Sequence, residues 1–554
     1  MDVDGSGAMS TRRRFSTSAF ASKRGPTCWE GAFQCNVASS LDRVGVLGEN
    51  GSGHRGCVNA LSWADGGEWL ISSGDDADIR IWRIDAATEF AGHVHEDGYP
   101  LKCETVINTG HTQNVFNVQQ LPGSKRITSV SGDRQVRVFD IGDALGRSPT
   151  GAEATYGTRQ ACIRILRCHT GRTKRILTED SPDVFLTVAE DGEVRQHDLR
   201  TFHSCNDGNC PAPLVKMPHE LSTMAMSPIR PYHIVVGGES PFAHLFDRRH
   251  AGRCIQAEWG VPLDESNLST CVRRFGRERR APGERRGYEH ITGAKMSAWN
   301  GHELLLSYSS DGVYLYSTQD DSETSNSLTS VTSSPVLRTP PLVTEANCLT
   351  GPMEEHVDVE HALDAIVSLE TSEDEAGMLD EGDEDGNEED DNLTISDYDI
   401  HKDIPTVYPR AKFTGHCNVE TVKDVNFLGL RDEYVVSGSD DGNAFVWQKA
   451  DGKLVDILVG DESVVNVIEG HPRLPLVAVS GIDKTIKLFA PVHGERQFSR
   501  ILSKDAICRR NVSASRRPLL PDTQLLHLLR MHLEHAQDGQ PGSREPSITQ
   551  CVNQ

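Results

Sequence analysis

A short motif ending in histidine recurs along this chain, and a strand-like segment closed by a ring side chain follows most copies at nearly the same interval. The motif residue and its closing residue are His54 and Trp82, His111 and Phe139, His169 and His197, His219 and Phe246, His416 and Trp447, and Asp461 and Phe489. Residues 291–317 repeat the strand pattern without the histidine and make a seventh unit. A repeat of this size predicts a closed array of similar units, because each unit buries its apolar faces against its neighbours.

Five repeats also carry an aspartate six residues before the closing side chain, namely Asp76, Asp133, Asp191, Asp441 and Asp483. A hairpin carboxylate can bind the turn backbone and face the histidine of its own unit, and a strand hydroxyl such as Ser72 or Ser437 can hold the other side of the ring. Ser, His and Asp together also resemble a nucleophilic catalytic set. Because the set recurs once per unit, we interpret it as a structural network. Its expected members are His54, Asp76, Trp82, His111, Asp133, His169, Asp191, His416, Asp441, Trp447 and Asp483.

These units resemble WD repeats, on the basis of the starting Gly-His, the hairpin Ser-Gly-Asp-Asp and the Trp-closed strand, over roughly residues 40–316 and 405–492. The resemblance implies an all-β, seven-bladed β-propeller in which each repeat supplies the outer strand of one blade and the inner three strands of the next. Residues 41–48 would then be the outer strand of blade seven and would pair with the strand near residues 485–489.

Charge divides the chain into segments. The net charge is -25, and residues 351–400 contain 20 Asp and Glu and no Lys or Arg. We expect a disordered basic tail over 1–36, the closing strand and blades one to five over 37–317, a disordered acidic insertion over 318–404, blades six and seven over 405–492, and a tail over 493–554 with a short amphipathic helix near 522–534. The insertion is either a solvated spacer or a site for basic partners. No apolar run approaches the ~18 residues that span a membrane, and we expect no membrane partner.

Seven arginines lie within fourteen residues, and they are Arg273, Arg274, Arg277, Arg279, Arg280, Arg285 and Arg286. Such a cluster can grip phosphate or an acidic peptide, can act as a nuclear-import signal, or can be a solvated loop, and the sequence leaves these alternatives open.

A few thiols have spacing reminiscent of metal ligands. His203, Cys205 and Cys210 follow the third strand of blade three, but no second pair of ligand residues lies close to them in sequence. We therefore expect no metal. The chain also lacks phosphate-binding loops, nucleophile elbows and zinc-protease motifs, so we expect no cofactor and no enzymatic activity.

Two successive repeats end in Asp-Xaa-Arg, with Asp198 and Arg200 in one and Asp247 and Arg249 in the next. Tandem boxes of this kind resemble those of the substrate receptors of cullin-4 RING ubiquitin ligases, most closely the WD/tetratricopeptide and nuclear-receptor-interacting branch, although His197 replaces the usual Trp.

The resemblance implies a non-enzymatic receptor whose boxes bind the triple-propeller adaptor while another surface binds a protein substrate. We expect a monomer within a larger complex, in the nucleus or the cytoplasm or both. The alternative is a chromatin or transcription scaffold that binds histones or nucleic acid.

Overall fold

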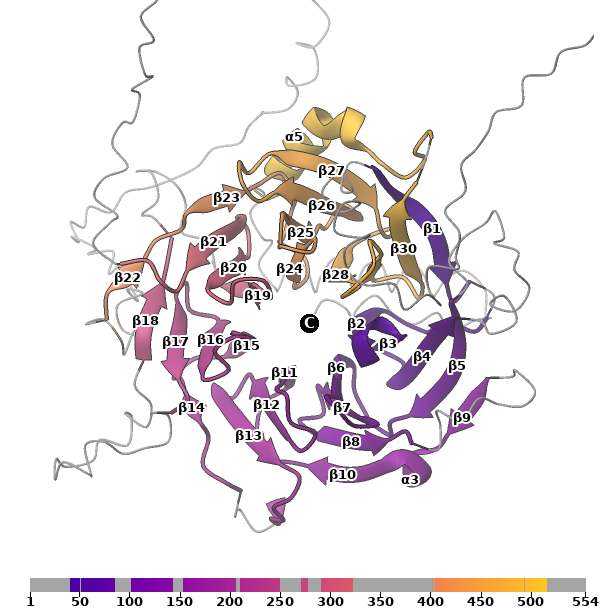
Figure 1. Cartoon of the computed structure of the whole chain (residues 1–554), viewed down its shortest axis with the longest axis vertical. Coiled ribbons are helices and arrows are strands. Elements are labelled where there is room, and N and C mark those ends of the chain that lie inside the picture. The colour runs from indigo at the N-terminus through magenta and orange to yellow at the C-terminus, as the bar shows by residue number, and fades with distance from the viewer. Residues whose placement is uncertain are drawn as a thin grey trace, which may run out of the picture. The chain divides into compact units, whose positions relative to one another are not determined.

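The computed structural model describes residues 40–49, 51–84, 101–142, 153–205, 210–249, 271–277, 290–321, 401, 404–492 and 494–515. These residues form seven sheets arranged as a ring (Figure 1). This arrangement confirms the predicted all-β, seven-bladed propeller. The predicted tail 1–36, most of the insertion 318–404 and the predicted helix near 522–534 lie outside the described residues.

Each blade has four antiparallel strands, which follow chain order from the inside of the ring outward in blades one to six, whereas the outer strand of blade seven is the N-terminal strand. Blade one contains β2 (Val58–Ala64), β3 (Trp69–Gly74), β4 (Asp78–Ile84) and β5 (Leu101–Asn108); blade two contains β6 (Val115–Leu121), β7 (Arg126–Ser131), β8 (Val136–Asp140) and β10 (Cys162–Leu166); blade three contains β11 (Thr173–Thr178), β12 (Val184–Ala189), β13 (Glu193–Asp198) and β14 (Val215–Lys216).

The later blades follow the same order. Blade four contains β15 (Leu221–Met226), β16 (His233–Gly238), β17 (Ala243–Asp247) and β18 (Cys271–Phe275); blade five contains β19 (Ile291–Met296), β20 (Glu303–Tyr308), β21 (Val313–Ser317) and β23 (Ala411–Phe413); blade six contains β24 (Val425–Leu428), β25 (Tyr434–Gly438), β26 (Asn443–Gln448) and β27 (Leu454–Val459); blade seven contains β28 (Val465–Gly470), β29 (Val477–Gly481), β30 (Ile486–Pro491) and the N-terminal β1 (Leu41–Leu47).

Two sheets have a fifth strand that pairs in parallel with the outer strand. β9 (Ala154–Tyr156) pairs with β5, and β22 (Thr406–Val407) pairs with β18. The segment 405–492 therefore does not contribute only to blades six and seven. Its first residues extend blade four through β22 and complete blade five through β23.

The N-terminal strand closes the ring, as the repeat predicts. β1 is antiparallel to β30, with Leu41 opposite Pro491 and Leu47 opposite Ile486 (Figure 1). The buried carboxylate of Asp42 accepts hydrogen bonds of 2.8 Å from the backbone N–H groups of Gln497 and Phe498. Strand pairing and these bonds remove the open edge that blade seven would otherwise present.

Apolar side chains fill the layers between adjacent blades. One cluster joins Ile71 and Ile81 of blade one to Val118 and Phe139 of blade two, and all four are almost fully buried. Because a blade is covered on both faces, its central strands are nearly continuous runs of apolar or small side chains. Burying a side chain of this size contributes about 2 kcal/mol, so inter-blade packing holds the ring together.

Helical structure is sparse in the described part of the chain. It comprises η3 (Asp65–Gly67), α3 (Thr158–Ala161), η7 (Ile501–Ser503) and α5 (Lys504–Ser515). The helix α5, which the sequence pattern did not predict, lies at the outside of blade six (Figure 1) and contributes Ile507 to that blade's core cluster. No described helix has both the length and the apolarity needed to cross a membrane.

Candidate partner-binding face

The two Asp-Xaa-Arg boxes form turns of the same geometry. β13 ends at Asp198 and β17 ends at Asp247, and each carboxylate accepts a 3.0 Å hydrogen bond from the backbone N–H of its arginine. The same carboxylate also accepts bonds from Nε and Nη2, at 2.9 and 2.7 Å in Arg200 and at 3.0 and 2.5 Å in Arg249. We call these two units the Asp–Arg clamps.

Both clamp arginines reach into solvent. The side chain of Arg200 is 68% exposed and that of Arg249 is 60% exposed, whereas their aspartates are more enclosed. The hydrogen bonds from Arg200 lower the pKa of Asp198 from 3.8 to about 2, and those from Arg249 lower the pKa of Asp247. Arg249 also lies over the ring of Tyr232, 3.9 Å from its centroid. Each guanidinium is thus held in one orientation with its Nη1 unbonded within the described residues.

Arg248 fixes the relation between the two blades that carry the clamps. Its guanidinium donates 2.7 Å to Gln196 Oε1 of β13 and forms an ion pair with Glu179 beyond β11. The Arg248 side chain is only 13% exposed. Arg248 is therefore an internal tie between blades three and four, whereas Arg200 and Arg249 extend into solvent.

Large apolar side chains are exposed in connections on the same side of the ring. In an antiparallel blade, the connections after the first and third strands emerge at the same end. Phe202 follows a third strand, and Ile229, Trp299 and Leu430 follow first strands, with exposures of 85%, 58%, 54% and 43%. Together with Arg200 and Arg249, we call this surface the clamp face. Arginine beside exposed aromatic and aliphatic groups is typical of protein interfaces.

Trp299 is held rigidly on this face. The buried carboxylate of Asp432, in blade six, accepts hydrogen bonds from Ser297 Oγ at 2.5 Å and from the backbone N–H of Trp299 at 3.1 Å. Arg431 lies over the indole ring, 5.3 Å from its centroid. A side chain that is exposed yet ordered in this way loses little conformational entropy when a partner covers it.

Blades one to three contain the histidine–aspartate network that the repeats suggest. Nδ1 of His54, His111 and His169 lies 2.9–3.2 Å from the carboxylate oxygens of Asp76, Asp133 and Asp191. Nε2 of each ring meets a strand hydroxyl at 2.7–2.8 Å, from Ser72, Ser129 and Thr187. Trp82 Nε1 donates to Ser72 Oγ at 2.8 Å, and His197 takes the corresponding place beside Thr187. Because this network is enclosed and recurs in three blades, we interpret it as stabilising the folded blades.

Blade six departs from this network, and the expected pairing of His416 with Asp441 and Ser437 is wrong. Neither ring nitrogen of His416 has a hydrogen-bond partner among the described residues. Asp441 instead accepts 2.9 Å from Asn511 Nδ2 of α5, and Trp447 donates to the carbonyl of Thr414. The interval from His416 to Trp447 is 31 residues, compared with 28 in blades one to three. The longer repeat shifts the histidine away from the hairpin carboxylate.

Blade seven replaces the histidine altogether. Asp461 stands in its place and accepts hydrogen bonds from the backbone N–H groups of Ser463 and Asp483. Burial and the nearby charge of Asp483 raise the pKa of Asp461. Lys487 of β30 forms ion pairs with both aspartates, so a lysine does in this blade what the histidine does elsewhere.

Three members of the arginine cluster are described, and all three have internal partners. Arg273 donates to the carbonyl of Asp320, Arg274 donates 2.8 Å to Thr406 Oγ1, and Arg277 pairs with Asp311. Arg279, Arg280, Arg285 and Arg286 lie outside the described residues, and the prediction of an anion-binding loop now rests on those four alone.

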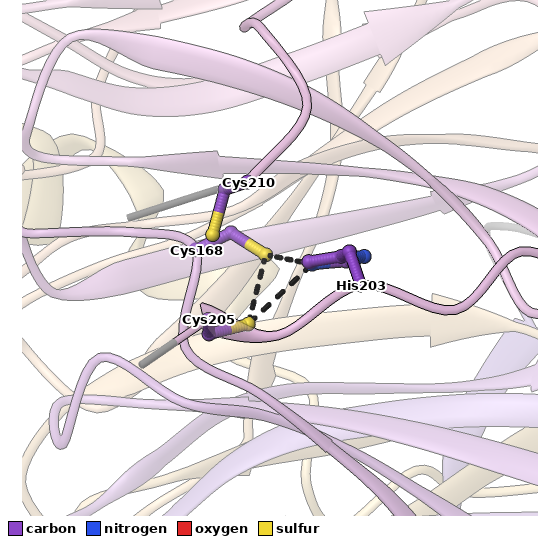
Figure 2. A group of neighbouring side chains, drawn as sticks. All are labelled: Cys168, His203, Cys205 and Cys210. Atoms are coloured by element: carbon purple, nitrogen blue, oxygen red, sulfur yellow. Dashed lines mark hydrogen bonds between the residues drawn. The ribbon is translucent and has the colours of Figure 1, made fainter. Parts of the chain in front are cut away.

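A group of metal-type ligands lies beside blade three, and the sequence motif contained only part of it. Cys168 Sγ, His203 Nε2, Cys205 Sγ and Cys210 Sγ all lie within 4.8 Å of one another (Figure 2). Cys168 precedes His203 by 35 residues, which is why spacing alone did not reveal it. Cys168 stands where blades one and two have Gly53 and Gly110, and this substitution was the one available signal.

Seven four-stranded blades, an N-terminal closing strand and repeated histidine–aspartate hairpins define a propeller of the kind that binds other proteins. The chain carries WD repeats. The family model described as "WD domain, G-beta repeat" matches residues 46–83, 101–140 and 408–448.

Several known proteins are similar to the chain. The WD repeat protein iqw1 of Schizosaccharomyces pombe is 34% identical over 49% of this chain and 32% of its own length. DDB1- and CUL4-associated factor 6 of Homo sapiens is 29% identical over 48% of this chain and 27% of its own length. WD and tetratricopeptide repeats protein 1 of Homo sapiens is 23% identical over 81% of this chain and 85% of its own length. The first two alignments thus span about a third or less of those relatives.

Proposed function

We propose that this propeller is a non-enzymatic substrate receptor of a cullin-4 RING ubiquitin ligase, and that it binds the ligase adaptor through Arg200 and Arg249. The observation that carries the proposal is the pair of Asp–Arg clamps with the same geometry at the same strand end of adjacent blades. The name of one relative, DDB1- and CUL4-associated factor 6, points to the same kind of assembly.

The clamp geometry suits binding to a protein surface. Each aspartate occupies Nε and Nη2, so Nη1 can donate to a backbone carbonyl or a carboxylate of the partner. Because the guanidinium is already oriented, binding costs less side-chain entropy than it would for a free arginine. The exposed apolar groups around the clamps supply surface that becomes favourable once it is covered.

The test is the adaptor affinity of a double variant, Arg200→Ala with Arg249→Ala, measured with the purified cullin-4 adaptor. An interface arginine of this kind contributes about 2 kcal/mol, so losing both should weaken binding by about a thousandfold. The matched control is Arg55→Ala, an exposed arginine in the connection entering β2, at the opposite strand end.

The melting temperature of the double variant should stay at the wild-type value, because exposed truncations cost little stability. A well-folded double variant that keeps its adaptor affinity would rule out this assignment of the clamps. The substrate is then sought among proteins that the wild-type chain, but not the double variant, brings to the ligase for ubiquitination.

A further inference from the structure

The group formed by Cys168, His203, Cys205 and Cys210 joins two neighbouring blades. Cys168 follows β10, the outer strand of blade two, while the other three residues lie in the connection between β13 and β14 of blade three. Cys168 is buried, and His203, Cys205 and Cys210 are half-buried. The four ligand atoms therefore meet at a protected place between segments that are distant in sequence.

The separations among the ligand atoms of Cys168, His203 and Cys205 are close to the edges of a tetrahedral site, and Cys210 Sγ lies within 4.8 Å of all three. Ligand bonds of about 2.3 Å for sulfur and about 2.0 Å for nitrogen place two sulfurs about 3.8 Å apart and a sulfur and a nitrogen about 3.5 Å apart. Cys168 Sγ and Cys205 Sγ are 3.7 Å apart. His203 Nε2 lies 3.1 Å from the first sulfur and 3.4 Å from the second.

Neither a disulfide nor ordinary core packing accounts for this group. A separation of 3.7 Å between two sulfurs is far longer than a disulfide bond of about 2.05 Å, and all three cysteines are free thiols. Core packing does not require an imidazole nitrogen directed at two thiols. The four residues contribute only sulfur and nitrogen donors, which suits zinc and disfavours magnesium or calcium. Four residues separate Cys205 from Cys210, and this spacing is within the range of zinc sites.

We infer that Cys168, His203, Cys205 and Cys210 bind one structural zinc ion that fastens the β13–β14 connection to the edge of blade two. On binding, the three thiols release their protons to solvent and coordinate as thiolates, and His203 coordinates through its neutral Nε2. Four protein ligands fill the tetrahedral set and leave no open position for a substrate. The backbone N–H of Arg167 donates to Cys205 Sγ at 3.4 Å, a contact that stabilises a thiolate.

The zinc ion adds to contacts that already hold this connection. Arg164 of β10 donates 2.6 Å to the carbonyl of Thr201 and lies 5.1 Å from the ring centroid of Phe202. Phe202 and Arg200 belong to the clamp face, so the metal fixes the segment that follows them. The inference goes beyond the proposed function and does not depend on it. Its test measures the metal content of the chain without the adaptor.

The experiment measures the metal content of the full chain, purified without chelators, by inductively coupled plasma mass spectrometry. We expect about one zinc ion per chain and an X-ray absorption spectrum of three sulfurs and one nitrogen. Cys205→Ser combined with Cys210→Ser should abolish zinc binding. The matched control is Cys162→Ser, which removes a half-buried thiol of β10 that is not part of the group and should keep the metal.

Two further measurements keep the inference testable if the serine variants fold poorly. His203→Cys should retain one zinc ion with four sulfurs, whereas His203→Ala should bind it more weakly. Wild-type protein stripped of metal should take up one Co²⁺ with the absorption bands of tetrahedral cobalt bound to thiolate. Wild-type protein that contains no zinc and shows no thiolate–cobalt band would overturn the inference, as would full zinc content in a folded Cys205→Ser, Cys210→Ser variant.

Discussion

Arg200 and Arg249 differ from Arg273, Arg274 and Arg277 in what their guanidinium groups contact. Within the described residues, the side chains of the first two form hydrogen bonds only to their own aspartates and extend into solvent, while the other three reach across to other elements. In sequence, the second group is the denser and more conspicuous one. We therefore propose that an oriented guanidinium with an unbonded donor, and not arginine density, marks the binding surface of this molecule.

The largest effect on stability is expected in a comparison of two histidines, His54 of blade one and His416 of blade six. His54→Leu removes the hydrogen-bond partner of buried Ser72 and of Asp76, whose side chain is 5% exposed, and should lower the free energy of unfolding by about 3 kcal/mol. His416 is a buried ring without hydrogen bonds among the described residues, and its centroid lies 5.3 Å from that of the Trp447 ring. His416→Leu should therefore change the free energy of unfolding by less than about 1 kcal/mol. Denaturant unfolding of both variants tests the difference. Equal losses would mean that the network in blade one does not stabilise the fold.

A smaller effect on stability is expected from Arg277, because the arginines of its group have internal partners and those of the clamps extend into solvent. Arg277 pairs with Asp311 and lies 4.5 Å from the ring centroid of Tyr308, with its side chain only 11% exposed. Arg277→Ala should therefore lower the free energy of unfolding by about 2 kcal/mol and leave adaptor affinity unchanged. Thermal unfolding and adaptor binding are measured on the same preparation. Reduced affinity at unchanged stability would place Arg277 in the binding surface instead.

The aspartates of the clamps should have a weaker influence on binding than the arginines. Asp198→Asn with Asp247→Asn keeps the turn geometry but loosens the hold on Nε and Nη2. We expect adaptor affinity to fall about tenfold, because each arginine must then be ordered on binding. Surface plasmon resonance measures the change. A loss as large as that of the arginine variants would show that the aspartates contact the adaptor themselves.

The smallest expected effect is that of pH. The pKa of Asp198 is about 2, lowered from 3.8, because Arg200 stabilises the carboxylate. A lowered pKa means that the clamp is complete above about pH 4 and is lost only as the pH falls toward 2. Adaptor affinity should therefore be constant between about pH 5 and about pH 8. A decline within that range would mean that another titrating group, such as a histidine, takes part in binding.

The repeat pattern predicts the ring and its closing strand because the strand-like segments and their interval of about 28 residues are local properties of the chain. The exceptions depend on contacts between distant segments. Asn511 replaces His416 as the partner of Asp441 through a helix that follows the last blade, and Cys168 reaches His203 across a blade boundary. No local spacing encodes either contact. The second arginine group likewise finds its partners in other elements, with Asp311 in the turn between β20 and β21 and Thr406 in β22.

The most direct test of the account replaces both clamp arginines by lysine. Arg200→Lys with Arg249→Lys keeps the positive charge but removes the planar fork that the aspartates orient. If oriented guanidinium groups hold the adaptor, its affinity measured by isothermal titration calorimetry should fall at least about a hundredfold, with the melting temperature unchanged. An affinity within about threefold of the wild type would contradict the account, because charge alone would then be sufficient.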